Sequence, residues 1–271
     1  STQPADSAQT TYFNLGILST MNRLNGVGFN AFGSVIGGNM NGIQFSGLAN
    51  MVGGSMRGVQ LSGISNINGN NMVGLSATGL VNIAGNQSKG VLLSGMTSIS
   101  GDNTSGVMAS GIMNISGDGA SGVHLAGLAN ITGATFNGVT AGGLLNVIGE
   151  HLNGVQISGF ANIVASRMNG VQIGLGNYAT KAKGVQIGLV NYYKNEMKGF
   201  QLGLVNANPD TKVQMLIFGG NATKINIGAR FKNKLFYTIK FDFYVVYKRN
   251  IAIVYTFLQL EKERLDIYSQ I

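Results

Sequence analysis

The chain has 271 residues, enough for one large domain, with 42 glycines, 2 prolines and no cysteine. Glycine without a strict three-residue period excludes collagen, and an apolar content of 44% excludes a disordered low-complexity chain. The missing cysteine excludes disulfide and thiolate metal sites, and no run of about 18 apolar residues encodes a transmembrane helix. Charged residues make up only 10%, and the formal net charge is +8.

Residues 1–25 are expected to form a flexible leader and an N-terminal cap. The opening stretch STQPADSAQTT is polar, and the first residue is Ser1. A removed signal peptide explains this start, as does a trimmed chain. We therefore expect a secreted or cell-surface protein, associated with an outer membrane after signal-peptide removal.

Residues 26–212 form a glycine-rich repeat with a sixteen-residue period. Glycine recurs at 26, 42, 58, 74, 90, 106, 122, 138, 154 and 170 without insertion or deletion. When each unit is numbered from this glycine, positions two, seven and ten are apolar in every unit. Position six is glycine in every unit except the first, and position twelve is glycine in every unit except the one that begins at Gly154. From Gly170 the steps shorten to fourteen residues (to Gly184) and fifteen residues (to Gly199).

This period predicts an all-β fold, a β-solenoid (parallel β-helix) of about eleven to twelve coils, mostly of 16 residues each. A helical repeat needs about 33 residues or more, and dense glycine destabilises helices. We expect positions two, seven and ten to fill a central apolar column. The alternative is an antiparallel β-barrel in which each unit supplies a strand and a turn.

Position nine predicts an asparagine ladder inside the solenoid. An inward asparagine at a turn can bond to the same residue one coil away and to the backbone of the turn. The ladder comprises Asn50, Asn66, Asn82, Asn114, Asn130, Asn146 and Asn162, with serine at Ser34 and Ser98.

Position three is expected to be a surface row. Its glutamines are Gln44, Gln60, Gln156, Gln172, Gln186 and Gln201. Stacked glutamines bond to one another along a column, which is a purely structural role. A flat array of amides is also a possible ligand face for sugars, although residues 26–169 contain no tyrosine or tryptophan to supply an aromatic platform.

Residues 213–271 are expected to form a β-rich basic C-terminal cap with a short terminal helix in LQLEKERLDIYSQI. KINIGARF and TIKFDFYVVYK alternate as half-buried strands do. A cap would cover the open end of the stack, and the competing interpretation is that these strands join a membrane barrel.

The excess positive charge follows the same division of the chain. Residues 170–271 hold fourteen basic and six acidic residues, whereas residues 1–169 hold four of each. A basic end predicts contact with an anionic envelope polymer or a surface polysaccharide, and end-to-end self-association is a second possibility. The chain has no recognition helix or arginine cluster, so no nucleic acid partner is expected.

Few residues could carry catalysis, and we expect neither an enzyme, a metal site nor a cofactor. His124 and His151 fall in different rows, and a repeat-surface histidine is usually without function. Asp102 and Asp118 share position thirteen in adjacent units, so they should lie about 5 Å apart. Paired carboxylates can do acid–base chemistry or bind calcium, but Asp-Asn and Asp-Gly are ordinary turn sequences.

The units GVQIGLVN and GFQLGLVN resemble the Gly-x-Gln-Ile-Gly-Leu-x-Asn repeats of bacterial surface-repeat proteins. The resemblance covers residues 26–206, and it implies a bacterial cell-surface or secreted location without any catalytic residue. The sequence therefore predicts a non-catalytic β-solenoid that acts as a rigid spacer, an adhesin or a scaffold. The alternatives are an outer-membrane β-barrel-associated protein and a polysaccharide-binding or polysaccharide-active β-helix.

Overall fold

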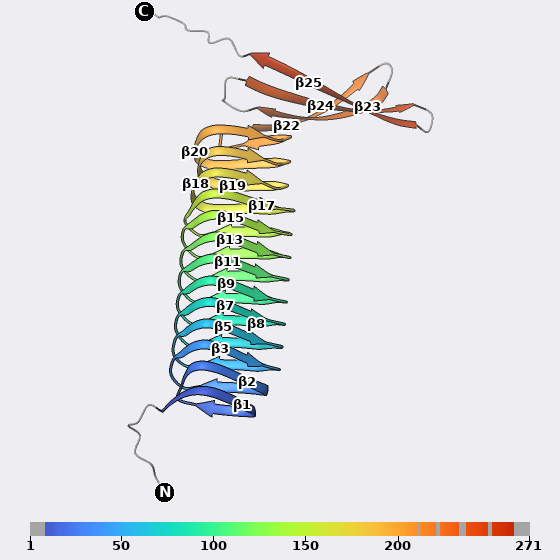
Figure 1. The fold of residues 1–271 in the computed structure, drawn as a ribbon. Helices are drawn as coiled ribbons and strands as arrows, with labels where there is room; N and C mark the ends of the chain where they lie inside the picture. Colours follow the sequence, from blue (N-terminus) through green and yellow to red (C-terminus); the bar gives the residue numbers. More distant parts are fainter. Residues whose placement is uncertain (1–8, 211, 221–222, 233–236, 249–250, 263–271) are drawn as a thin grey trace, which may run out of the picture.

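The computed structural model describes residues 9–210 with their side chains, and the backbone of residues 212–220, 223–232, 237–248 and 251–262. Within these residues every regular element is a β-strand, and twenty-one of the strands form one parallel stack (Figure 1). The stack begins with β1 (Thr10–Met21) and β2 (Arg23–Ile36) and ends with β21 (Val205–Ala207). The predicted β-solenoid is confirmed.

Each sixteen-residue coil contributes one long strand and one short strand. The long strand runs from position fifteen of one unit to position five of the next, and the short strand covers positions eight to eleven. The long strands are β3 (Met40–Ser46), β5 (Met56–Ser62), β7 (Met72–Thr78), β9 (Ser88–Ser94), β11 (Thr104–Ser110), β13 (Ala120–Ala126), β15 (Phe136–Gly142) and β17 (His151–Ser158). The short strands are β4 (Ala49–Val52), β6 (Ser65–Asn68), β8 (Val81–Ala84), β10 (Thr97–Ser100), β12 (Met113–Ser116), β14 (Ala129–Thr132) and β16 (Leu145–Ile148).

The last coils fuse these two strands into longer ones: β18 (Ala161–Ile173), β19 (Gly176–Ile187) and β20 (Val190–Leu202). Their shorter period is absorbed at both turns of the coil: Ile157 pairs with Ile173 and Ala161 with Gly176, and register shifts fall between Val164 and Arg167 and between Ala179 and Lys181. The pairing of β1 with β2 also contains register shifts, whereas from β2 to β17 the register is strict, so that Gly106 pairs with Gly122 and Asn114 with Asn130. All pairings among β1–β21 are parallel, which makes the antiparallel alternative wrong for residues 10–207.

Three columns of glycine allow the backbones of neighbouring coils to lie in direct contact. Position-one glycines, one in each of twelve coils, have φ between 108° and 158°. At positions one, six and twelve, a Cβ would overlap the carbonyl oxygen of the equivalent residue one coil earlier; Gly106, Gly111 and Gly101 are examples. The fixed glycines therefore reflect backbone packed directly on backbone, which no larger residue permits.

The apolar side chains that were expected to fill the central column point outward instead. Positions three, five, nine, eleven and fifteen point inward, whereas positions two, four, seven, eight and ten point outward. Leu48, Leu80 and Phe160 at position seven are 43%, 41% and 65% exposed. The prediction that positions two, seven and ten fill the core is wrong, because strict alternation places position ten outward once asparagine at position nine points inward.

The apolar core comes instead from positions eleven and fifteen, which the sequence interpretation missed. Two clusters of buried apolar side chains line the interior, one around Met40, Val52 and Met56 and the other around Phe136 and Leu152. Between the clusters, hydroxyl pairs replace apolar contacts: Ser88 Oγ donates to Ser100 Oγ at 3.0 Å, and the hydroxyls of Thr104 and Ser116 lie 2.7 Å apart.

The two ends of the stack differ. β1 pairs with β2, so the stack begins inside the segment that was expected to be a leader and cap, and residues 1–8 lie outside the described part. Beyond β21, two antiparallel hairpins follow (Figure 1): β22 (Lys212–Gly220) with β23 (Thr223–Lys232), and β24 (Tyr237–Lys248) with β25 (Ile251–Lys262).

The predicted terminal helix is wrong where it can be compared. Leu258–Lys262 belongs to β25, in which aromatic and β-branched residues favour a strand, and residues 263–271 lie outside the described part. Within the residues that the structure describes, no helix has the length and apolar character needed to cross a membrane.

Candidate functional surface

The outer surface of the stack carries unbroken apolar rows. Positions two and four project from the long strands, position ten projects from the opposite face, and position seven forms the edge that joins the two faces. Position four reads Phe29, Phe45, Leu61, Ala77, Leu93, Ala109, Leu125, Ala141, Ile157, Ile173, Ile187 and Leu202. Position seven and its equivalents read Phe32, Leu48, Ile64, Leu80, Met96, Ile112, Leu128, Leu144, Phe160, Leu175, Leu189 and Leu204.

Neighbouring side chains in these rows pack on one another along the stack. The rings of Phe29 and Phe45 lie 6.4 Å apart on one face. Tyr178 and Tyr192 stack at 5.7 Å with an angle of 7° on the other face. We call the surface made by positions two, four, seven and ten the apolar surface.

All charged residues of the stack lie on the opposite edge, which we call the polar edge. It consists of positions twelve to sixteen and their equivalents in the shortened coils, and no residue at positions two to eleven of a sixteen-residue coil, or at the equivalent positions of a shortened coil, is Asp, Glu, Lys or Arg. Its charged residues are Arg23, Arg57, Lys89, Asp102, Asp118, Glu150, Arg167, Lys181, Lys183, Lys194, Glu196 and Lys198. Lys198 Nζ lies 2.8 Å from Glu196 Oε1, and this hydrogen bond lowers the pKa of the Glu196 carboxyl.

The backbone of the turns beneath the apolar surface bonds from coil to coil. Along the position-seven edge from Leu48 to Phe160, the N–H of each residue donates to the carbonyl of the same row one coil earlier: Leu80 to Ile64 at 3.1 Å, Met96 to Leu80 at 3.0 Å and Ile112 to Met96 at 2.8 Å. Because the turns bond along the stack, this edge exposes apolar side chains over paired backbone rather than over free amide groups.

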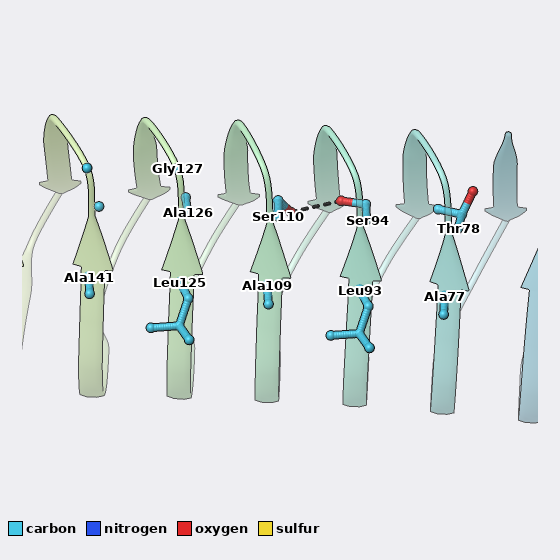
Figure 2. A pocket seen from close by; sticks show the side chains of 12 residues that line it. Ala77, Thr78, Leu93, Ser94, Ala109, Ser110, Leu125, Ala126, Gly127 and Ala141 are labelled. Atoms are coloured by element: carbon cyan, nitrogen blue, oxygen red, sulfur yellow. Dashed lines mark hydrogen bonds between the residues drawn. The ribbon is translucent and has the colours of Figure 1, made fainter. Parts of the chain in front are cut away.

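Shallow grooves run along this edge. Figure 2 shows one of them, where Leu93 and Leu125 project beside the smaller Ala77, Ala109 and Ala141. The groove has a volume of about 730 Å³ and continues over Ser94, Ser110 and Gly127. A second groove of about 630 Å³ is lined by Leu175, Leu189, Leu204 and their neighbours. Both are open depressions lined mainly by aliphatic side chains.

The asparagine ladder lies inside the coils, as position nine predicted. Asn114 Nδ2 donates to Asn130 Oδ1 at 2.8 Å, Asn130 to Asn146 at 2.9 Å and Asn146 to Asn162 at 3.0 Å. The ladder continues beyond the prediction through Asn177, Asn191 and Asn206.

The same row is irregular nearer the N-terminus. Asn50 donates to Asn66 at 3.0 Å, but Asn66 reaches Asn82 through the Ser76 hydroxyl, which donates to Asn82 at 2.6 Å. At Ser98 the row holds a hydroxyl bonded to Ser94 at 2.9 Å. Each asparagine also donates to a carbonyl of the next coil, as Asn130 does to Ala141 at 2.8 Å, so the row fastens neighbouring turns.

The glutamine row was expected on the surface, and that placement is wrong. Gln44, Gln60, Gln156, Gln172 and Gln186 are fully buried. Gln172 donates to Gln156 at 2.9 Å, Gln186 to Gln172 at 2.7 Å and Gln201 to Gln186 at 2.6 Å. Because their amides are enclosed and bonded to one another, these residues form an internal ladder and not an accessible ligand face.

His124 is buried inside the coils, whereas Asp102 and Asp118 lie on the polar edge. His124 lies in the buried position-three row, edge-to-face with Phe136 at 5.0 Å, and burial lowers its pKa to about 4. Asp102 and Asp118 lie side by side on the polar edge, where Asp118 accepts a hydrogen bond from Asn103 at 3.3 Å. In the part of the chain that is described, no three His, Cys, Asp or Glu side chains group as a metal site would require.

The apolar surface is the feature that the sequence interpretation failed to locate. The signal was present, since positions two to eleven of every sixteen-residue coil, and the equivalent residues of the shortened coils, lack charge while the polar edge carries all of it. Comparison with models of protein families, with curated proteins and with solved structures finds no match to this chain.

Proposed function

We propose that the chain is a non-catalytic structural protein of the bacterial cell surface, a rigid rod that acts as a spacer, an adhesin stalk or an assembly scaffold. The observation that carries this proposal is the continuous parallel pairing from β2 to β20, in which equivalent residues pair coil after coil, with register shifts only at the turns of the last coils. Twelve coils at about 4.8 Å each give a rod roughly 58 Å long.

The internal ladders support a mechanical role. Asparagine and glutamine amides bond along the rod axis, in addition to the backbone bonds between coils. Bending or separating two coils would break both sets of bonds at once, so the rod resists deformation along its axis. The proposed surface location is based on the likeness of GVQIGLVN to bacterial surface repeats.

The basic C-terminal section is proposed to contact an anionic envelope polymer. Fourteen of the eighteen basic residues of the chain lie from residue 170 onward. Such attraction should weaken as salt is raised, because the Debye length falls from about 10 Å at 0.1 M to about 3 Å at 1 M. Binding to teichoic acid or lipopolysaccharide at low and high salt measures it.

Two measurements test the structural role. Protease treatment and antibody labelling of intact cells establish whether the chain is displayed, and electron microscopy of the isolated protein establishes whether it is a rod. A compact particle, or a chain protected inside the cell, would contradict the proposal. Turnover of a polysaccharide by the pure protein, abolished by Asp102→Ala or Asp118→Ala, would replace it with an enzymatic function.

A further inference from the structure

We propose that the apolar surface is immersed in one leaflet of a phospholipid bilayer, with the rod axis parallel to the membrane and the polar edge in the headgroup region. This deepens the proposed function, because it names the medium that surrounds the scaffold. The immersion depends on the proposed function in one respect: both require that the chain forms a rod.

The distribution of apolar residues indicates a surrounding medium rather than a docking partner. A second protein copy would cover one face of the stack. Here both sheet faces and the edge between them are apolar, with Leu93 on one face, Met51 on the other and Leu144 on the edge exposed by 39%, 44% and 54%. Contiguous apolar patches of this extent on soluble proteins mark protein or membrane contacts.

The charge distribution points in the same direction. Wherever a coil carries charged residues, they lie on the polar edge, and the polar edges of successive coils form one stripe along the rod. A polar stripe opposite an apolar surface is the arrangement of elements that lie in a membrane interface. Tyr178 and Tyr192 lie at position ten, close to the polar edge, where interfacial tyrosines are favoured.

The hydrogen bonds of the coils are compatible with a hydrocarbon environment. In a hydrocarbon environment every backbone polar group must be paired within the protein. The position-seven turns from Leu48 to Phe160 satisfy this for the N–H groups of their row, as the bonds from Leu128 to Ile112 and from Leu144 to Leu128 illustrate at 2.9 Å each. The amide side chains of positions three and nine are turned inward, where they bond to one another along the glutamine and asparagine ladders.

The dimensions select the orientation. From position two to position seven a coil covers five residue spacings, about 16 Å at about 3.3 Å per residue. One leaflet of hydrocarbon is about 15 Å thick, half of a core of about 30 Å. A rod of roughly 58 Å standing upright would exceed the bilayer core and would carry its charged stripe through hydrocarbon. A rod lying flat keeps the whole stripe at the surface.

Flotation of the full chain with vesicles of pure phosphatidylcholine in about 0.5 M salt tests the proposal. High salt and a zwitterionic lipid suppress electrostatic adsorption by the basic C-terminal section. The wild-type chain is expected to float with the vesicles. Failure to float, or flotation that needs anionic lipid and low salt, would overturn the immersion.

A matched pair of variants locates the contact. Leu80→Asp, Ile112→Asp and Leu144→Asp together place three carboxylates on the position-seven edge. Asn41→Asp, Ser105→Asp and Asn137→Asp place three on exposed position-sixteen sites of the polar edge. The first variant should lower the vesicle partition coefficient by at least about a hundredfold, because charge in hydrocarbon is costly, whereas the second should leave it within about threefold. Equal partitioning of the two variants would contradict the proposal.

A fluorescent probe covers the case in which the first variant fails to fold, as judged by circular dichroism. The chain contains no tryptophan, so Leu144→Trp and Asn137→Trp each supply a single reporter. With lipids brominated on their acyl chains, Leu144→Trp should be quenched and Asn137→Trp should not. A blue shift of Leu144→Trp without quenching would show that a second copy of the chain covers this edge, and the proposal would be wrong.

The outcome is separable from that of the proposed function. Electron microscopy of the isolated chain reports the rod shape without lipid. A rod that does not enter vesicles would overturn the immersion alone, whereas a compact particle would overturn the scaffold.

Discussion

At the scale of single residues, the glycine columns show how tightly the coils are stacked. Gly101 and Gly37 both occupy position twelve, but they meet different surroundings. A Cβ on Gly101 would overlap the carbonyl oxygen of Gly85, whereas a Cβ on Gly37 would have nothing within 4 Å. The same repeat position therefore tolerates a side chain where the earlier coil leaves room for a Cβ, even though the Gly37 N–H still donates to the carbonyl of Met21 at 2.9 Å.

We expect Gly101→Ala to destabilise the fold by about 3 kcal/mol, because the backbone of two coils must move apart. Gly37→Ala serves as the control and should stay within about 1 kcal/mol of the wild type, since it adds a methyl group in open space. Denaturant unfolding followed by circular dichroism measures both. Equal effects of the two substitutions would show that the stacking distance is not set by these glycines.

His124 gives the stack a sensitivity to acid. Its imidazole is 1% exposed, its pKa is lowered by burial from 6.5 to about 4, and its Nε2 has no hydrogen-bond partner among the described residues. Because the folded pKa is the lower one, the unfolded chain binds more protons between pH 6.5 and pH 4. Stability is therefore lost as the pH falls through that window, by about 3 kcal/mol in all.

His124→Gln should remove this part of the pH dependence, because glutamine is the usual residue of the buried row and does not titrate. Unfolding of both proteins at pH 7 and at pH 4.5 provides the comparison. The wild type should lose more stability than the variant, and an equal loss would mean that the histidine is accessible to water in the folded chain.

At the scale of the strand, alternation decides which side chains face inward. In β12 the side chains of Asn114 and Ser116 are buried and that of Ile115 is half-buried on the outer face. Apolar content suggests the opposite arrangement, with isoleucine in the core. The buried asparagine fixes the choice, since two adjacent residues of a strand cannot both point inward.

Two neighbouring substitutions test this assignment. Ser116→Asp should abolish cooperative unfolding or cost more than about 3 kcal/mol, because it buries a charge beside Thr104. Ile115→Asp should cost only about 1 kcal/mol, mainly through lower strand propensity and lost contact with Ile99 and Ile131. Thermal and denaturant unfolding measure both, and the reverse order would return the isoleucine row to the core.

At the scale of the whole molecule, the stack is a repetition in which each coil contacts its two neighbours. Stability is then a sum of coil and interface terms, and no coil inside the regular section is essential to the fold. The shortened coils after Gly170 show that the chain also accommodates a changed period, because one residue is lost at the position-seven edge, between Ile173 and Gly176, and another at the polar-edge turn, between Ala179 and Lys181.

Deletion of residues 106–121, one whole coil, should leave a folded rod shorter by about 4.8 Å, because Gly122 takes the place of Gly106 in register. Deletion of residues 106–113, half a coil, should disrupt the fold, since the short strand β12 would then follow the polar-edge turn in place of the long strand β11, and the close-packed glycines Gly106 and Gly111 would be lost. Small-angle scattering and circular dichroism distinguish the two, and similar behaviour of both deletions would contradict the stacked register.

The period alone determined much of this protein. Sixteen-residue spacing without insertions, glycine at three fixed positions and asparagine at a fourth are sufficient to predict a parallel β-solenoid and its internal ladder, because only stacked coils place equivalent residues on equivalent residues. The tertiary structure decided which rows face outward. A composition rule places leucine and isoleucine inside, but the narrow interior is filled by amides, hydroxyls and the residues at positions eleven and fifteen, and the remaining apolar rows are left on the surface.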